Sequence, residues 1–118
     1  MPTDKFPYNL EGKVFRSLAN TDNGEVDGNT RFLYHQKADI IWATYEGGQV
    51  RFGTLSGYME PNGDLHFRYQ HQNLAGEFMT GKCHSIPSTS ADGKIRFEEH
   101  WTWTSGDQSS GQSMIEEL

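Results

Sequence analysis

The sequence has few of the features that accompany secretion or membrane insertion. Cys83 is the one cysteine among 118 residues, so no internal disulfide can form and nothing indicates an oxidising compartment. Residues 1–13 lack the apolar segment of a secretory signal, and no later segment approaches the length of a membrane-spanning helix. We therefore expect a cytoplasmic location and no membrane partner.

Positive charge is also scarce. The chain has 10 Lys and Arg residues against 16 Asp and Glu residues, which gives a formal net charge of -6. Nucleic-acid binding needs a cationic face that releases counterions from the phosphate backbone, so nucleic acid is not an expected partner. The sequence contains no glycine-rich phosphate loop and no nucleophile-elbow motif, and we expect no cofactor.

Metal and thiol chemistry have little support either. The five histidines are His35, His66, His71, His84 and His100. No two of them are spaced two apart, the spacing that places both side chains on one face of a strand, so no metal site is predicted. The thiol of Cys83 and its neighbour His84 would point to opposite faces, which disfavours a nucleophile pair.

Glycine is plentiful by contrast. The 13 glycines include several Asp-Gly and Asn-Gly pairs, which permit the positive φ of tight hairpins. The segments between them are rich in β-branched and aromatic residues, as is typical of strands. The predicted strands cover residues 13–19, 28–37, 39–46, 49–60, 64–73, 76–86, 94–104 and 111–118.

Short connections between successive strands predict antiparallel pairing of neighbours. A flat sheet in so small a protein would leave two exposed edges, and closure removes them. We therefore predict an all-β fold in which residues 1–118 form a single antiparallel, up-and-down, eight-stranded β-barrel, with residues 1–11 as an N-terminal arm. A two-sheet β-sandwich is the alternative. Such a barrel is either filled by side chains or holds one small ligand.

The segment KIRFEEHWTW places a carboxylate in an apolar stripe. Ile95, Phe97, Glu99, Trp101 and Trp103 share one face of a strand because side chains alternate with period two. A buried carboxylate must be paired or must take up a proton. Glu99 is therefore predicted to point into the barrel.

Three roles for Glu99 follow. It can be part of a satisfied structural network, with Arg51, Arg16 or Tyr69 as its partner. It can be the polar anchor of a ligand pocket, or it can act as a catalytic acid or base. Because the last hairpin is predicted to place Glu117 opposite Glu99, those two residues are the catalytic candidates.

The turn sequences predict the register of two further hairpins. A three-residue loop with Gly63 in a left-handed conformation would pair Met59 with Leu65, Gly57 with Phe67, Leu55 with Tyr69, and Gly53 with His71. A loop over residues 87–93 would place Met79 near Trp101, Gly81 near Glu99, and Cys83 near Phe97.

We predict that the protein binds a small, partly apolar ligand. The predicted ligand-binding residues are Glu99, Trp101, Trp103, Phe67, Tyr69, His71, Met79 and Cys83. An enzyme using Glu99 and Glu117 is one alternative. A filled structural barrel that acts through its outer surface is another: the outward side of the fourth strand would carry Val50, Phe52 and Tyr58, an apolar strip that indicates a possible homodimer.

Several segments resemble a family of small bacterial all-β proteins that often carry the name N-acetylglutamate synthase. These segments are EPNGDLHFRYQHQN, GEFMTGKC, GKIRFEEHWTWTSGDQSSG and SMIEEL. The name implies acetyl transfer, but such transferases use an α/β fold with a glycine-containing loop at a helix N-terminus, and the sequence predicts neither. LEGKVF, residues 10–15, is similar to the first strand of calycin-like, lipocalin-related barrels, which implies small-molecule binding.

Overall fold

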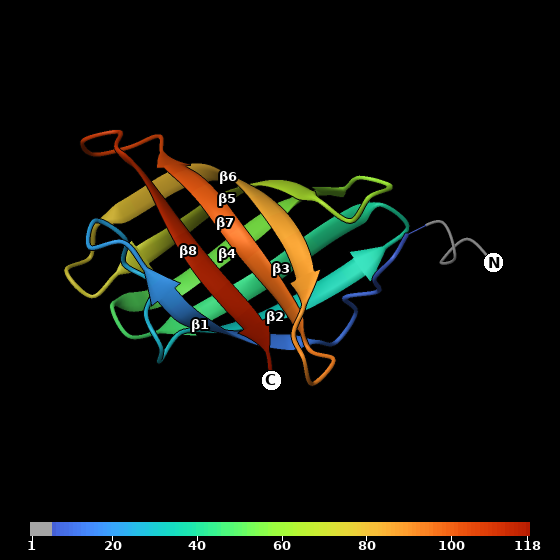
Figure 1. The fold of residues 1–118 in the computed structure, drawn as a ribbon. Coiled ribbons are helices and arrows are strands. Elements are labelled where there is room, and N and C mark those ends of the chain that lie inside the picture. Colours follow the sequence, from blue (N-terminus) through green and yellow to red (C-terminus); the bar gives the residue numbers. More distant parts are fainter. Residues whose placement is uncertain (1–5) are drawn as a thin grey trace.

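The computed structural model describes residues 6–118, which form eight antiparallel strands (Figure 1). The strands are β1 (Val14–Asn20), β2 (Arg31–Lys37), β3 (Ile40–Gly47), β4 (Val50–Met59), β5 (Leu65–Asn73), β6 (Phe78–Thr89), β7 (Ile95–Trp103) and β8 (Ser110–Glu117). Each strand pairs with its neighbours in sequence, and β8 pairs back with β1 to close the barrel. The predicted up-and-down barrel is confirmed, and the sandwich alternative is wrong.

The strands follow the alternation of apolar and polar residues. In β7, the side chains of Ile95, Phe97, Glu99, Trp101 and Trp103 are buried, while the residues between them are at least partly exposed. Residues 6–118 contain no helix that is long and apolar enough to cross a membrane.

The two ends of the barrel are built differently. The β1–β2, β3–β4, β5–β6 and β7–β8 connections lie at one end, and the other three connections lie at the opposite end (Figure 1). Near this second end the interior is filled by apolar side chains that are less than 2% exposed: Leu10, Phe15, Tyr34, Ile41, Met59, Leu65, Phe97 and Ile115. We call this set the packed end. There the rings of Phe15 and Phe97 have centroids 5.6 Å apart.

The chain before β1 helps to close the packed end. The predicted arm over residues 1–11 is described from Phe6 onward, and its first five residues lie outside the described part. Leu10 is fully buried, and its backbone N–H donates to Gln36 Oε1 at 2.9 Å. The backbone N–H of Gly12 donates to the carbonyl of Tyr34. Residues 6–12 therefore pack against the barrel.

The predicted register of the β4–β5 hairpin is confirmed. Met59 pairs with Leu65, and the pairing continues through Leu55 with Tyr69. Gly63 has a φ of 95°, the left-handed conformation that the three-residue loop requires.

The predicted register of β6 with β7 is wrong. Gly81 pairs with Trp103, and Ser85 pairs with Glu99. The cause is Pro87, which lies inside β6, although its sequence context resembles a loop. The strand continues to Thr89, so the turn is shorter than the predicted loop over residues 87–93 and every pair moves along the strand.

The outer side of β4 differs from the prediction at one residue. Phe52 and Tyr58 are half exposed, but Val50 is buried. A bulge between Val50 and Phe52 in the pairing with β5 turns Val50 inward. A homodimer through this surface stays a prediction.

Candidate functional site

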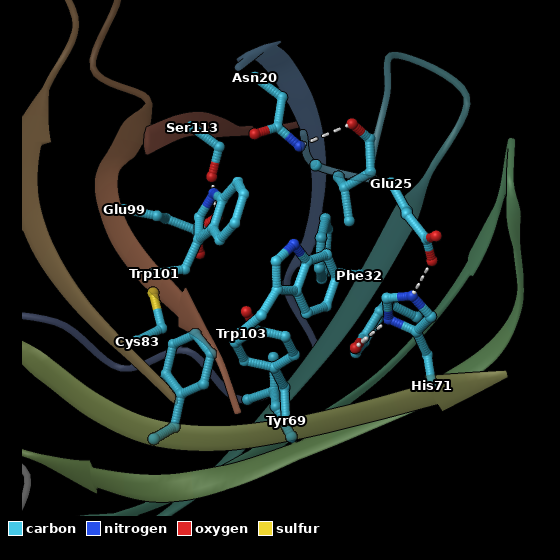
Figure 2. Close-up of a pocket in the computed structure, with 15 residues that line it drawn as sticks. Asn20, Glu25, Phe32, Tyr69, His71, Cys83, Glu99, Trp101, Trp103 and Ser113 are labelled. Carbon is cyan, nitrogen blue, oxygen red and sulfur yellow. Dashed lines mark hydrogen bonds and ion pairs between the residues drawn. The ribbon is translucent and has the colours of Figure 1, made fainter. Parts of the chain in front are cut away.

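A small cavity lies in the lumen at the end opposite the packed end, and we call it the lumen pocket (Figure 2). Its volume is about 50 Å³. The predicted ligand-binding residues that line it are Phe67, Tyr69, His71, Cys83, Glu99, Trp101 and Trp103. Met79 packs against the core but does not line the pocket.

Glu99 points into the lumen pocket and is 6% exposed. Ser113 Oγ donates to its Oε1 at 2.9 Å, and Ser85 Oγ lies 3.5 Å from its Oε2. Burial raises the pKa of Glu99 to about 7, although the two serine hydroxyls act in the opposite direction. The carboxyl group therefore changes its protonation state near neutral pH.

The predicted partners of Glu99 are wrong. Glu99 is opposite Ser113 on β8, because β8 begins at Ser110 and its register differs from the prediction. Glu117 lies further along β8, where it accepts from Lys13 Nζ at 2.7 Å, an interaction that lowers the pKa of Glu117. The two glutamates therefore do not form a catalytic pair.

None of the predicted structural partners of Glu99 is bonded to it. Arg51, Arg16 and Tyr69 make no hydrogen bond to its carboxyl group, which two serines satisfy in their place. A serine hydroxyl carries no charge, so the carboxylate is solvated by dipoles alone. This explains why desolvation dominates the pKa.

His71 occupies a hydrogen-bonded chain at the mouth of the pocket (Figure 2). Its Nε2 lies 2.8 Å from Glu25 Oε1, and its Nδ1 lies 2.9 Å from the hydroxyl of Tyr45. Burial raises the pKa of Tyr45 well above its ordinary value, so its hydroxyl keeps its proton within this chain.

The rings around the pocket rest on glycines across the strands. Tyr69 pairs with Gly81, and Trp101 pairs with Gly111. A Cβ at either glycine would overlap the facing ring. Glycine therefore lets the aromatic side chains lie against the barrel wall, and the lumen between them stays partly open.

The β1–β2 connection covers the pocket. Trp103 Nε1 donates to the carbonyl of Asn23 at 3.0 Å, and Asn20 Nδ2 donates to the carbonyl of Val26 at 2.9 Å. Glu25 is held by His71, as described above. These contacts fix residues 21–30, which we call the cover loop, over the lumen.

One polar atom at the pocket has no partner among residues 6–118. Asn20 Oδ1 is buried and accepts no hydrogen bond from residues 6–118 (Figure 2). A buried polar atom without a partner is costly, so Asn20 Oδ1 favours a hydrogen-bond donor in the pocket.

Several lining residues were not predicted from the sequence. They are Asn20, Gly24, Glu25, Val26, Phe32, Tyr45, Leu55 and Ser113. Tyr45 could have been found, because it is opposite Gly53 in the same ring-on-glycine arrangement. The cover-loop residues have no periodic pattern that would reveal them.

The pocket offers no evident metal or nucleophile chemistry. Among residues 6–118 no group of three His, Cys, Asp or Glu side chains is placed to hold a metal ion. Burial raises the pKa of the Cys83 thiol well above its ordinary value, so it remains protonated and unreactive.

Comparison with known proteins gave one match at the family level. A family model described as Avidin-like protein matches residues 8–118. No curated protein and no solved structure matched the chain. The matched range includes all eight strands and the cover loop.

Proposed function

Because the chain belongs to the avidin-like protein family, we propose that it binds one small, partly apolar molecule in the lumen pocket. Eight-stranded barrels are wide enough to hold a single small ligand, as in lipocalins and streptavidin. Family membership supports the binding of a small molecule, while the chemistry of that molecule follows from the residues of the site.

The observation that carries the proposal is the contrast between walls and polar groups in the pocket. The walls are aromatic, and the polar groups are few and specifically placed, which is the usual composition of a small-molecule site. Asn20 Oδ1 is a free acceptor, and Glu99 is an acceptor once it is ionised. A ligand with N–H or O–H donors on an apolar body would complement both.

The size of the pocket requires the cover loop to move. A volume of about 50 Å³ holds a few water molecules. Sites for drug-sized ligands are roughly 300–1,000 Å³. Most contacts of the cover loop with the barrel involve side chains, among them those of Trp103, Asn20 and His71, and one backbone bond joins its first residue to Gln112 of β8. We therefore assign ligand entry to its opening.

Native mass spectrometry of the protein purified from its own host tests the proposal directly. A retained small molecule would appear as a mass increment and would give the class of the ligand. Biotin, which streptavidin binds, is the first probe to add to the empty protein. Binding should quench the fluorescence of Trp101 and Trp103, measured in a Trp42→Phe background because Trp42 lies on the outer surface.

Two variants of adjacent residues separate pocket binding from other effects. Glu99→Gln should weaken binding at least tenfold, because it replaces the carboxylate that faces the pocket. Glu98→Gln is the matched control, since Glu98 points outward from the same strand. Equal affinities for both variants would contradict the proposal and favour a filled barrel, in which Glu99 affects stability alone.

Proton transfer by Glu99 is the second candidate function. The pKa of about 7 suits a general acid or base at neutral pH. Both carboxyl oxygens, however, are engaged by serine hydroxyls beneath a closed loop. This arrangement favours a binding anchor over a catalyst.

A further inference from the structure

Two cations lie side by side on the outer surface of the barrel, away from the lumen pocket. Arg68 on β5 is directly opposite Lys82 on β6, and both side chains are exposed. Like charges at directly opposed positions of an antiparallel pair are destabilising. Their juxtaposition therefore lacks an explanation in the stability of the sheet.

No carboxylate in the described part of the chain forms an ion pair with either cation. Among residues 6–118, Arg68 and Lys82 have no ion-pair partner, whereas Lys13 and Arg96 are both bonded to glutamates. The nearest outward neighbours across the strands are Ser56 and Thr102. Those along the two strands are histidine, glutamine and threonine.

None of the neighbouring strand positions just named is acidic, which is unexpected from the composition of the chain. The chain carries 16 acidic against 10 basic residues, so an average surface position next to a cation would often be acidic. Arg68 and Lys82 are therefore a local exception on a protein whose net charge is -6, and the histidines near them contact the carboxylates of Glu60, Asp64 and Glu98.

The surface around the pair is hollowed on both sides. One groove of about 490 Å³ is lined by Arg68 and Lys82 together with Tyr58, His66, His84 and His100. The rings of His66 and His84 stack there with centroids 4.4 Å apart. A second groove of about 540 Å³ continues past Arg68 toward Trp42.

We propose that this outer groove is a second binding site, which takes an oxyanion with two adjacent negative charges between Arg68 and Lys82. Guanidinium groups bind phosphate and carboxylate through paired hydrogen bonds, and an ammonium group adds a point charge. Ser56 lies beside Arg68 and Thr102 lies beside Lys82, so each cation has a neutral hydroxyl on its far side. An anion there removes the repulsion between the two cations.

Titration calorimetry at low ionic strength tests the site with two probes, inorganic pyrophosphate and malonate. We expect saturable binding of at least one probe, and the tighter probe identifies phosphate or carboxylate as the recognised group. Arg68→Gln and Lys82→Gln should each weaken binding about tenfold. Added salt should weaken it further, because the site is exposed.

Matched controls keep the test decisive. Arg51→Gln removes an exposed cation from β4 with the same change in net charge, and it should change the affinity less than twofold. Glu99→Gln alters the lumen pocket and should leave the oxyanion affinity unchanged. The proposal is overturned if neither probe shows saturable binding, or if Arg51→Gln weakens binding as much as Arg68→Gln.

Discussion

The packed end and the lumen pocket lie in the same barrel, but side chains fill the first and a cavity remains in the second. At the packed end, Phe15, Tyr34 and Phe97 fill the lumen with rings in edge or tilted contact. At the pocket, Trp101 and Trp103 are also buried, yet they border a void that contains a carboxyl group. Aromatic residues therefore build both a solid core and a cavity wall.

The difference comes from what faces each ring. At the pocket, the rings of Tyr45, Tyr69 and Trp101 lie against the backbone of glycines on the neighbouring strands. At the packed end, Phe97 pairs with Ile115, so two large side chains meet in the lumen. A glycine across the strand is thus one way in which an aromatic ring comes to line a cavity instead of filling it.

The largest expected effect is the loss of a ring from the packed end. Phe97→Ala should lower the free energy of unfolding by about 4 kcal/mol, because it leaves a cavity in a close-packed region. Phe67→Ala, at the pocket, should cost clearly less, because the void is already present there. Urea unfolding measures both, and equal losses would remove the distinction between the two ends.

The second effect is the pH dependence caused by Glu99. Its pKa is about 7 in the folded protein, above its ordinary value of 4.5, so its contribution to stability is complete below about pH 4.5. That contribution is lost as the pH rises through about 7, and it amounts to about 3 kcal/mol.

Urea unfolding of Glu99→Gln at several pH values measures the contribution of Glu99 to the pH dependence of stability. The variant lacks the titrating group, so its stability relative to the wild-type protein should rise between about pH 5 and pH 8. Glu46→Gln, an exposed substitution on β3, should follow the wild-type curve. A constant difference between Glu99→Gln and the wild type would show that the carboxyl group does not titrate in this range.

The barrel and the inward position of Glu99 could be predicted from the sequence because both depend on local periodicity. Alternation in β7 is fixed by period two, whatever the neighbouring strands do. The β4–β5 register could also be predicted, since a three-residue loop with Gly63 in a left-handed conformation fixes the pairing.

The surroundings of Glu99 could not be predicted in the same way. They depend on where β6 ends, and Pro87 obscures that boundary because proline more often marks a loop. A shift of this turn replaced Gly81 with Ser85 opposite Glu99. Glu25 comes from the cover loop, and Asn20 binds that loop from the end of β1. These contacts depend on tertiary structure and on no periodic pattern.

An intermediate effect on stability is expected when a glycine that faces an aromatic ring is replaced. Gly81→Ala would place a methyl group against the ring of Tyr69, which must then move into the pocket. We expect a loss of about 2 kcal/mol in the free energy of unfolding, typical of overpacking. Gly28→Ala is the control, since its Cβ would be 3.9 Å from the nearest atom, the carbonyl oxygen of Ser17. Similar stability for both variants would show that the wall tolerates side chains and that glycine does not shape the cavity.

The smallest expected effect concerns the cover loop, and it tests how the pocket end opens. Glu25→Gln replaces the carboxylate that His71 and Asn73 hold, so the closed loop should lose about 1 kcal/mol. Amide hydrogen exchange in residues 21–30 should then be about fivefold faster. Glu46→Gln, an exposed substitution at the same end, should leave exchange unchanged. The turn over residues 90–94, at the packed end, should exchange equally in all three proteins. If the cover loop exchanges no faster in Glu25→Gln, its closure does not depend on this contact, and a ligand must reach Glu99 by another route.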